Sequence, residues 1–336
     1  SPAEGRFDPD AMRDRYRVER DKRLRADGND QYIEAVGEFA HYTDDPYVES
    51  PIERPPLTDE VDVIVVGGGF GGLQMGARLR EAGVEDLRII EKGGDFGGTW
   101  YWNRYPGCMC DVESYTYLPL LEEMGYIPSM KFASGFEIME YCQNLAERFG
   151  FYEHCLFHTT VTETRWEAAQ KRWVVSTDRG DAMRARYVIL ANGLLTTPKL
   201  AKIEGMTRFQ GDSFHTSRWN YHLDLAGKRV GIIGTGATAV QVVPELAKVV
   251  EALYVFQRTP SSVDVRDQRA TTQEELETWP NEPNWAKARR ARFAKISAGR
   301  TAMKANDDYL AGKVADFKER KQHDRELSPE EMVQKQ

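Results

Sequence analysis

The chain has 336 residues, 41% hydrophobic and 29% charged, a balance that excludes a fully disordered protein. This length accommodates about two domains of ~100–200 residues each. The net charge of −8 argues against nucleic-acid or anionic-membrane partners, because these bind a basic face.

Two further features of the composition bear on location and metals. No stretch reaches the ~18 consecutive apolar residues of a membrane span, and the first thirty residues are rich in Arg and Asp. The four cysteines include no Cys-x-x-Cys pair and no zinc-like spacing with His. We therefore expect a cytoplasmic protein with reduced thiols, no membrane partner and no metal.

Residues 1–58 are predicted to form an N-terminal helical extension and a linker. Apolar residues such as Met12, Tyr16, Leu24 and Val36 occur at loosely helical spacing up to about residue 40. Residues 44–59 are rich in proline and acid, which predicts an extended segment over the main body.

Residues 59–200 show the pattern of a dinucleotide-binding domain. The run 61–66 indicates a strand, 67–72 a glycine-rich turn and 73–82 a helix. A second buried strand, 87–90, follows and ends at Glu91, and residues 158–177 alternate like a hairpin. A further buried strand is expected at 187–191.

The glycine turn of this domain has the spacing that a dinucleotide needs. Gly67 permits a tight turn, Gly69 allows the backbone to approach a pyrophosphate, and Gly72 lets the helix pack closely on the strand. The helix N-terminus attracts phosphate, and Glu91 can accept hydrogen bonds from ribose hydroxyls. Phe70 and Lys92 are expected to be further contacts of this dinucleotide. The alternative is a structural turn without a ligand.

Residues 226–336 repeat the pattern with one difference. A strand at 228–233, a turn containing Gly234, Gly236 and Ala239, a helix at 240–249 and a strand at 252–256 are predicted. Where the first domain has Glu91, the second has Arg258, whose guanidinium can bind a 2′-phosphate. This favours NADPH, with Thr238 and Thr259 as additional contacts. The alternative is that Arg258 is a solvated charge.

The predicted fold class is therefore α/β, with two Rossmann-like dinucleotide-binding domains and an N-terminal helical extension. From about residue 271 the chain is helical and charged, with Trp279, Trp285 and Phe293 as expected anchors. Because the second domain shows only its first two strands, we expect the C-terminal part of the protein to be missing from this chain.

The linker 201–225 carries a motif that connects the two domains. Read as FxGxxxHxxxW, its residues Phe209, Gly211, His215 and Trp219 resemble the fingerprint of type I Baeyer–Villiger monooxygenases, which are class B flavoprotein monooxygenases. Asn220 departs from the Pro or Asp usual in that family. The resemblance extends from Asp59 to about Pro260.

The resemblance implies FAD and NADPH as cofactors, and O2 and a ketone as substrates, with an ester or lactone as product. The long N-terminal extension resembles that of the subgroup acting on bulky cyclic, macrocyclic or steroid ketones, and we expect a monomer. Further flavin contacts are implied at Gly98, Thr99, Trp100, Trp102, Asp111, Tyr117, Ala191 and Asn192.

Two residues are candidates for catalytic roles. By resemblance, Asp111 lies beside the flavin and interacts with an arginine that aids nicotinamide binding, and that arginine is expected outside this chain. His215 could act as an acid or base, since a free imidazole titrates near neutrality, but a structural role that pins the two domains together is preferred.

Three other functions remain open. An N- or S-oxygenating flavoprotein would share both glycine turns, although its linker usually lacks a Trp at position 219. A flavin disulfide reductase would need a Cys-x-x-Cys pair, which is absent from the sequence. A non-catalytic module would bind FAD without consuming NADPH.

Overall fold

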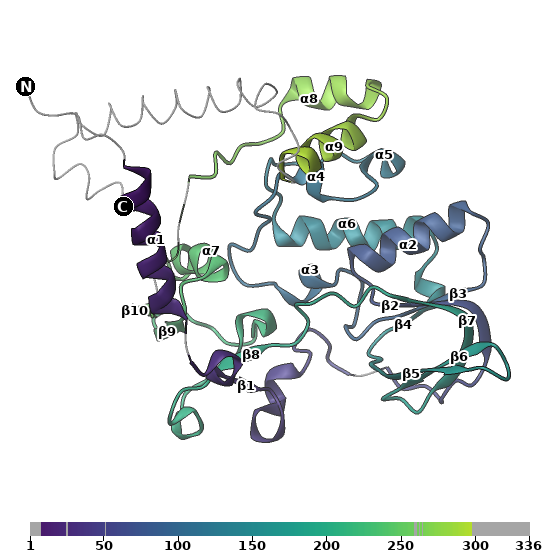
Figure 1. Cartoon of the computed structure of the whole chain (residues 1–336), viewed down its shortest axis with the longest axis horizontal. Coiled ribbons are helices and arrows are strands. Elements are labelled where there is room, and N and C mark those ends of the chain that lie inside the picture. Colours follow the sequence, from purple (N-terminus) through teal and green to yellow (C-terminus); the bar gives the residue numbers. More distant parts are fainter. Residues whose placement is uncertain are drawn as a thin grey trace, which may run out of the picture. The chain divides into compact units, whose positions relative to one another are not determined.

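The computed structural model describes residues 8–24, 26–50, 52–258, 261, 263 and 265–297. They form two compact units (Figure 1). The first comprises Ser1–Asp111 and Ser129–Ala270, and the second comprises Val112–Pro128 and the chain from Thr271 onward. None of the helices within the described ranges combines the length and apolar character needed to cross a bilayer.

A six-stranded sheet organises the first unit. The strand order is β4-β3-β2-β7-β6-β5, parallel from β4 to β7, with β6 and β5 added as an antiparallel hairpin. The strands are β2 (Glu60–Val66), β3 (Leu87–Ile90), β4 (Cys155–Leu156), β5 (Val161–Glu167), β6 (Arg172–Thr177) and β7 (Ala182–Leu190). The predicted strand at 87–90 and the predicted hairpin are thus confirmed.

The central parallel strands carry apolar residues on both faces. Ile64, Val65 and Ile89 are fully buried, as expected for strands covered on both sides. Helices α2 (Phe70–Glu81) and α6 (Gly135–Arg148) pack against each other over one face of the sheet (Figure 1). Helix α6 was not anticipated from the sequence, although its buried residues have helical spacing: Ile138, Tyr141, Cys142 and Leu145.

A buried strand was predicted at 187–191. The structure has a strand there, but this part of it is not buried. Strand β7 begins earlier, at Ala182, and its first half is the buried part, with Met183 and Ala185 fully enclosed. Tyr187 is 59% exposed and Leu190 is 67% exposed. The described elements cover the sheet over the first half of β7 but leave these two side chains open.

The N-terminal extension is helical over only part of its length. Helix α1 (Pro9–Arg23) is capped by Asp8, but Tyr32–Glu34 forms strand β1, which pairs with β8 (Lys199–Ala201). The expectation of helix up to residue 40 was therefore wrong here. The pairing is formed with a segment far along the chain, and Leu200 is buried in a small cluster against which Ile33 packs.

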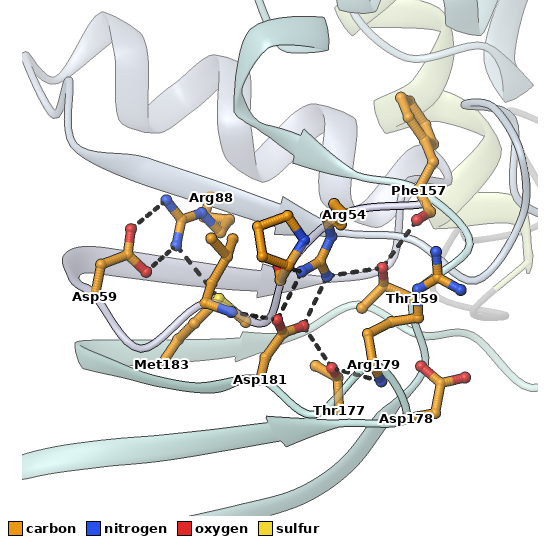
Figure 2. A network of polar contacts seen from close by, with 12 residues as sticks. Arg54, Asp59, Arg88, Phe157, Thr159, Thr177, Asp178, Arg179, Asp181 and Met183 are labelled. Atoms are coloured by element: carbon orange, nitrogen blue, oxygen red, sulfur yellow. Dashed lines mark hydrogen bonds and ion pairs between the residues drawn. The ribbon is translucent and has the colours of Figure 1, made fainter. Parts of the chain in front are cut away.

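The predicted extended linker is only partly matched: residues 52–59 lie outside helices and strands, whereas residues 44–50 contain a turn and bends. Figure 2 shows how Arg54 attaches it to the sheet. Both terminal nitrogens of Arg54 bond Asp181, at 2.6 and 2.7 Å, and the Leu57 N–H donates to the same carboxylate at 2.8 Å. Thr177 donates its hydroxyl to Asp181 as well.

The second predicted dinucleotide-binding pattern forms a two-stranded parallel sheet. Strands β9 (Arg229–Ile233) and β10 (Ala252–Phe256) flank helix α7 (Ala237–Leu246). Helices α2 and α7 both begin three residues earlier than predicted. The glycines Gly69 and Gly236 are their N-cap residues, so the last part of each glycine motif is already helical.

The described part of the second unit contains the α-helices α4 (Ser114–Tyr117), α5 (Leu121–Met124), α8 (Gln273–Thr278) and α9 (Trp285–Ser297). The prediction of helix from about residue 271 is confirmed at α8 and α9, whereas α4 and α5 were not predicted. Trp279 and Trp285 are buried and stack with ring centroids 5.3 Å apart. The expectation for Phe293 was wrong, because its side chain is 44% exposed on α9.

Candidate functional site

The first glycine turn is shaped by close backbone contacts. Gly67 has a φ of 111°, and a Cβ there would lie 2.5 Å from the Ala191 carbonyl oxygen. A Cβ on Gly72 would lie 1.8 Å from the Gly67 carbonyl oxygen, so helix α2 meets strand β2 more closely than any side chain permits. Among the described residues, no side-chain hydrogen bond caps the N-terminus of α2 at Gly69. A helix N-terminus at a glycine turn is a place where anions bind.

Two other predicted segments lie directly against this turn. Gly98, with a φ of 55°, would place a Cβ 2.7 Å from the Cα of Gly69. Ala191 follows β7, and its N–H donates to the Val66 carbonyl oxygen at 2.8 Å. Three regions far apart in the sequence thus meet at the carboxyl end of β2, where ligands bind in sheets of this type.

Glu91 lies next to the turn, directly after β3, and is 5% exposed. Its two carboxylate oxygens accept the N–H groups of Gly68 at 2.5 Å and Gly93 at 2.7 Å. Burial raises the pKa of Glu91, while backbone hydrogen bonds from Gly93, Gly68 and Lys92 act in the opposite direction. Lys92 is half-buried, and burial together with nearby Arg218 lowers its pKa.

The predicted flavin loop forms the short helix α3 (Thr99–Trp102) after Gly98. Trp100 and Trp102 are buried, at 8% and 1% exposure. The backbone carbonyl of Trp102 accepts the Tyr47 hydroxyl at 3.2 Å. The N-terminal linker therefore packs directly on this loop. Asn192, just after Ala191, is exposed, and Tyr117 belongs to the second unit.

Asp111 is exposed and pairs with Arg266. The other terminal nitrogen of Arg266 donates to the Cys110 carbonyl at 2.9 Å. The resemblance placed the active-site arginine that interacts with Asp111 outside this chain, and that expectation stays a prediction. Arg266 is a partner of Asp111 within the chain, and its position beyond Arg258 contains no motif that would have identified it.

The second glycine turn is more open than the first. Gly234 has a φ of 103°, and added Cβ atoms on Gly234 or Gly236 would meet nothing described within 4 Å. Ala239 is buried on α7, and Thr238 is half-buried beside it. Arg258 follows β10 and donates to Gln31 Oε1 at 2.7 Å. Thr259 lies outside the described residues.

The fingerprint linker contains a capped turn. His215 accepts the Ser217 N–H at Nδ1, at 3.1 Å, and so caps the turn 216–218. Burial lowers the pKa of His215, with Arg218 adding to the effect. Trp219 is 6% exposed, and its backbone N–H donates to the Tyr47 hydroxyl at 3.0 Å. A neutral, accepting His215 fits the structural role better than proton transfer.

Comparisons with known proteins agree with this geometry. A model of the pyridine nucleotide-disulphide oxidoreductase family matches residues 64–310. Neopentalenolactone D synthase of Streptomyces avermitilis is 53% identical over 305 residues, covering 87% of this chain and 50% of the relative.

Two solved structures are also similar. Polycyclic ketone monooxygenase of Thermothelomyces thermophila has a TM-score of 0.79 at 40% identity, covering 85% of this chain and 50% of its own. OTEMO, solved with FAD and NADP, has a TM-score of 0.62 at 36% identity, covering 68% of this chain and 44% of its own. The chain thus spans about half the length of these relatives. It belongs to the type I Baeyer–Villiger monooxygenases, within the broader oxidoreductase family named above.

Proposed function

We propose that the protein is an FAD- and NADPH-dependent Baeyer–Villiger monooxygenase. It would insert one oxygen atom of O2 next to the carbonyl of a bulky cyclic ketone and so form an ester or lactone. The observation that carries this proposal is that one compact unit contains two motifs, each made of a strand, a glycine turn and a helix. The next strand of the first motif, β3, is followed by Glu91, and the next strand of the second motif, β10, is followed by Arg258. Family membership and a relative named polycyclic ketone monooxygenase support it.

The first turn fits the pyrophosphate of FAD. A Cβ at Gly67 or Gly72 would overlap backbone atoms, so the sequence keeps this segment free of side chains where a ligand approaches. We assign residues 59–200 to the FAD-binding domain. The residues that would hold FAD are Gly67, Gly69, Phe70, Gly72, Glu91, Lys92, Gly98, Thr99, Trp100, Trp102, Asp111, Ala191 and Asn192. Tyr117 lies in the second unit and stays an expectation from the resemblance.

The second turn fits a cofactor with a 2′-phosphate. Its open glycines leave space for a pyrophosphate, and Arg258 supplies a cation where the first domain has an acid. We assign residues 226–336 to the NADP-binding domain, joined by the fingerprint linker 201–225. The residues that would hold NADPH are Gly234, Gly236, Thr238, Ala239, Arg258 and Thr259.

The bound cofactors would supply hydride transfer and oxygen activation, and the chain supplies orientation and charge. Asp111 would hold the Arg266 guanidinium in place, so that a cation lies where negative charge develops. His215 would fix the linker as a neutral cap. We further propose that the protein is cytoplasmic, in keeping with its four free cysteines, and that it is a monomer.

The purified enzyme tests this proposal through its spectrum and its products. We expect flavin absorbance, faster oxidation of NADPH than of NADH, and a product from a cyclic ketone that is heavier by one oxygen atom. A tertiary amine serves as the comparison substrate. Recovery of an N-oxide with no lactone from any ketone would reject the assignment.

A further inference from the structure

The Gln241 side chain is one of the links between the two predicted dinucleotide-binding domains. It lies on α7, the helix that begins at the second glycine turn, and it contacts the loop 105–111 that ends at Asp111. We propose that Gln241 is a positioning residue that couples the second site to the geometry at Asp111. This inference rests on the proposed function.

The Gln241 amide makes four hydrogen bonds to this loop. Its Oε1 accepts the Tyr105 hydroxyl at 2.9 Å and the Met109 N–H at 3.3 Å. Its Nε2 donates to the Met109 carbonyl at 3.0 Å and to Asp111 Oδ1 at 3.1 Å. These four bonds use two donor and two acceptor positions of the amide.

The orientation of the amide follows from its partners. The backbone N–H of Met109 can only donate and its carbonyl can only accept, so the oxygen and nitrogen of Gln241 cannot be exchanged. Burial raises the pKa of Tyr105, which keeps its hydroxyl protonated. Gln241 is also the one polar residue in the run 239–244. A single amide within an otherwise apolar run is the feature of the sequence that indicates a positioning role for Gln241.

The loop lies close to the backbone of α7. Gly107 has a φ of 77°, and a Cβ there would lie 2.5 Å from the Gln241 carbonyl oxygen. The other edge of the loop is bonded to the segment before α6, through the Cys110 N–H to Ala133 at 3.0 Å and the Gly135 N–H to Cys108 at 2.8 Å. The loop is therefore held between the first domain and α7.

This arrangement gives ligand binding a direct path to Asp111. Gln241 is five residues beyond the N-cap Gly236, about 7.5 Å along the helix axis. A pyrophosphate that shifts the N-terminus of α7 would shift the Gln241 amide by a similar distance, and Asp111 would move with the amide. A displacement of about 1 Å is enough to change a reaction rate by a large factor.

Two substitutions separate positioning from folding. Gln241→Asn retracts the amide from the loop, and Gln241→Glu keeps the acceptor oxygen but places a carboxylate opposite Asp111. Glu245→Gln is the matched control, because Glu245 is one turn later on α7 and its carboxylate pairs with Lys248. The measurements are hydrogen exchange over residues 105–111 without NADPH, flavin content, and the rate of flavin reduction at saturating NADPH.

We expect faster exchange at residues 105–111 in both Gln241 variants and normal flavin content. Reduction at saturating NADPH should fall about tenfold, as when a hydrogen bond to a charged group is lost, with little change in the half-saturating NADPH concentration. In Gln241→Glu the rate should recover as pH falls, because the protonated carboxyl again donates to Asp111. Gln241→Asn should show no such recovery.

Wild-type exchange and wild-type reduction rates in both Gln241 variants would overturn the inference. Equal effects in Glu245→Gln would also overturn it, because they would show a general disturbance of α7. A wild-type protein that binds flavin but makes no lactone would reject the proposed function instead. The exchange measurement does not depend on that outcome.

Discussion

The guanidinium of Arg218 lies over the Trp102 indole, with its central carbon 3.6 Å from the ring centroid. Arg218 is 4% exposed, and it donates to the carbonyls of Ser217 and Thr196 at 2.8 and 2.9 Å. Burial lowers the pKa of Arg218 to about 10, so it remains charged at neutral pH. The fingerprint linker is thereby stacked on the predicted flavin loop.

Arg218→Lys should reduce the free energy of unfolding by about 2 kcal/mol, because an ammonium group cannot stack flat on the face of the indole or reach both carbonyls. Arg229→Lys is the control, since Arg229 is exposed and 5.7 Å from the Tyr254 ring. Chemical denaturation of the two variants measures the difference. Equal losses would contradict a special role for the buried stack.

Asp181→Asn should destabilise the protein by about 3–5 kcal/mol, because it leaves the largely buried Arg54 without its carboxylate. The double variant Arg54→Met with Asp181→Asn removes both charges and should regain part of that loss. Thermal or denaturant unfolding measures both. A single variant as stable as the wild type would show that this pair contributes little.

The same carboxylate predicts a pH dependence. Burial alone would raise the pKa of Asp181, but the hydrogen bonds from Arg54, Thr177 and Leu57 lower it to about 2. Its contribution of roughly 2 kcal/mol is therefore complete above about pH 4 and lost as pH falls toward 2. Unfolding free energies over this range should decline less steeply in Asp181→Asn than in the wild type.

Gly72→Ala should abolish flavin binding, because its Cβ would overlap the Gly67 carbonyl at 1.8 Å. Gly236→Ala has space for its methyl group and should keep flavin while weakening NADPH binding. Flavin absorbance per protein and the NADPH concentration at half-saturation measure these effects. Retained flavin in Gly72→Ala would be inconsistent with the turn described here.

Arg258→Ala should raise the NADPH concentration at half-saturation about tenfold or more and leave NADH nearly unchanged, because a charged hydrogen-bond donor to phosphate is lost. Gln31→Ala removes the residue to which Arg258 is bonded and should preserve the preference for NADPH. Steady-state kinetics with both cofactors measures this. Parallel losses for NADH and NADPH would argue that Arg258 does not contact a 2′-phosphate.

His215→Asn should leave the pH–rate profile unchanged, because the amide oxygen can replace Nδ1 as the acceptor for Ser217 while being unable to titrate. His215→Leu removes the acceptor and should lower the melting temperature. A profile in which one titration disappears in His215→Asn would instead assign His215 to proton transfer.

Sequence patterns predicted the strands and turns that are specified by neighbouring residues in the chain. Strands β2, β3, β9 and β10 follow from short β-branched and apolar runs, and the glycine turns between strand and helix were located correctly. Strand β1 could not be predicted, because it depends on pairing with β8, which is far away in the chain. The side chains that contact Asp111 were missed for the same reason, since Arg266 and Gln241 reach it only in the folded chain.

The attachment of Arg54 to the sheet limits how the protein can be shortened. A version that begins at β2, at Glu60, would retain Asp181, whose side chain is fully enclosed, but would lack Arg54, the cation that neutralises it. Engineers who trim the leading residues should therefore start no later than position 53, or replace Asp181 with an uncharged residue at the same time.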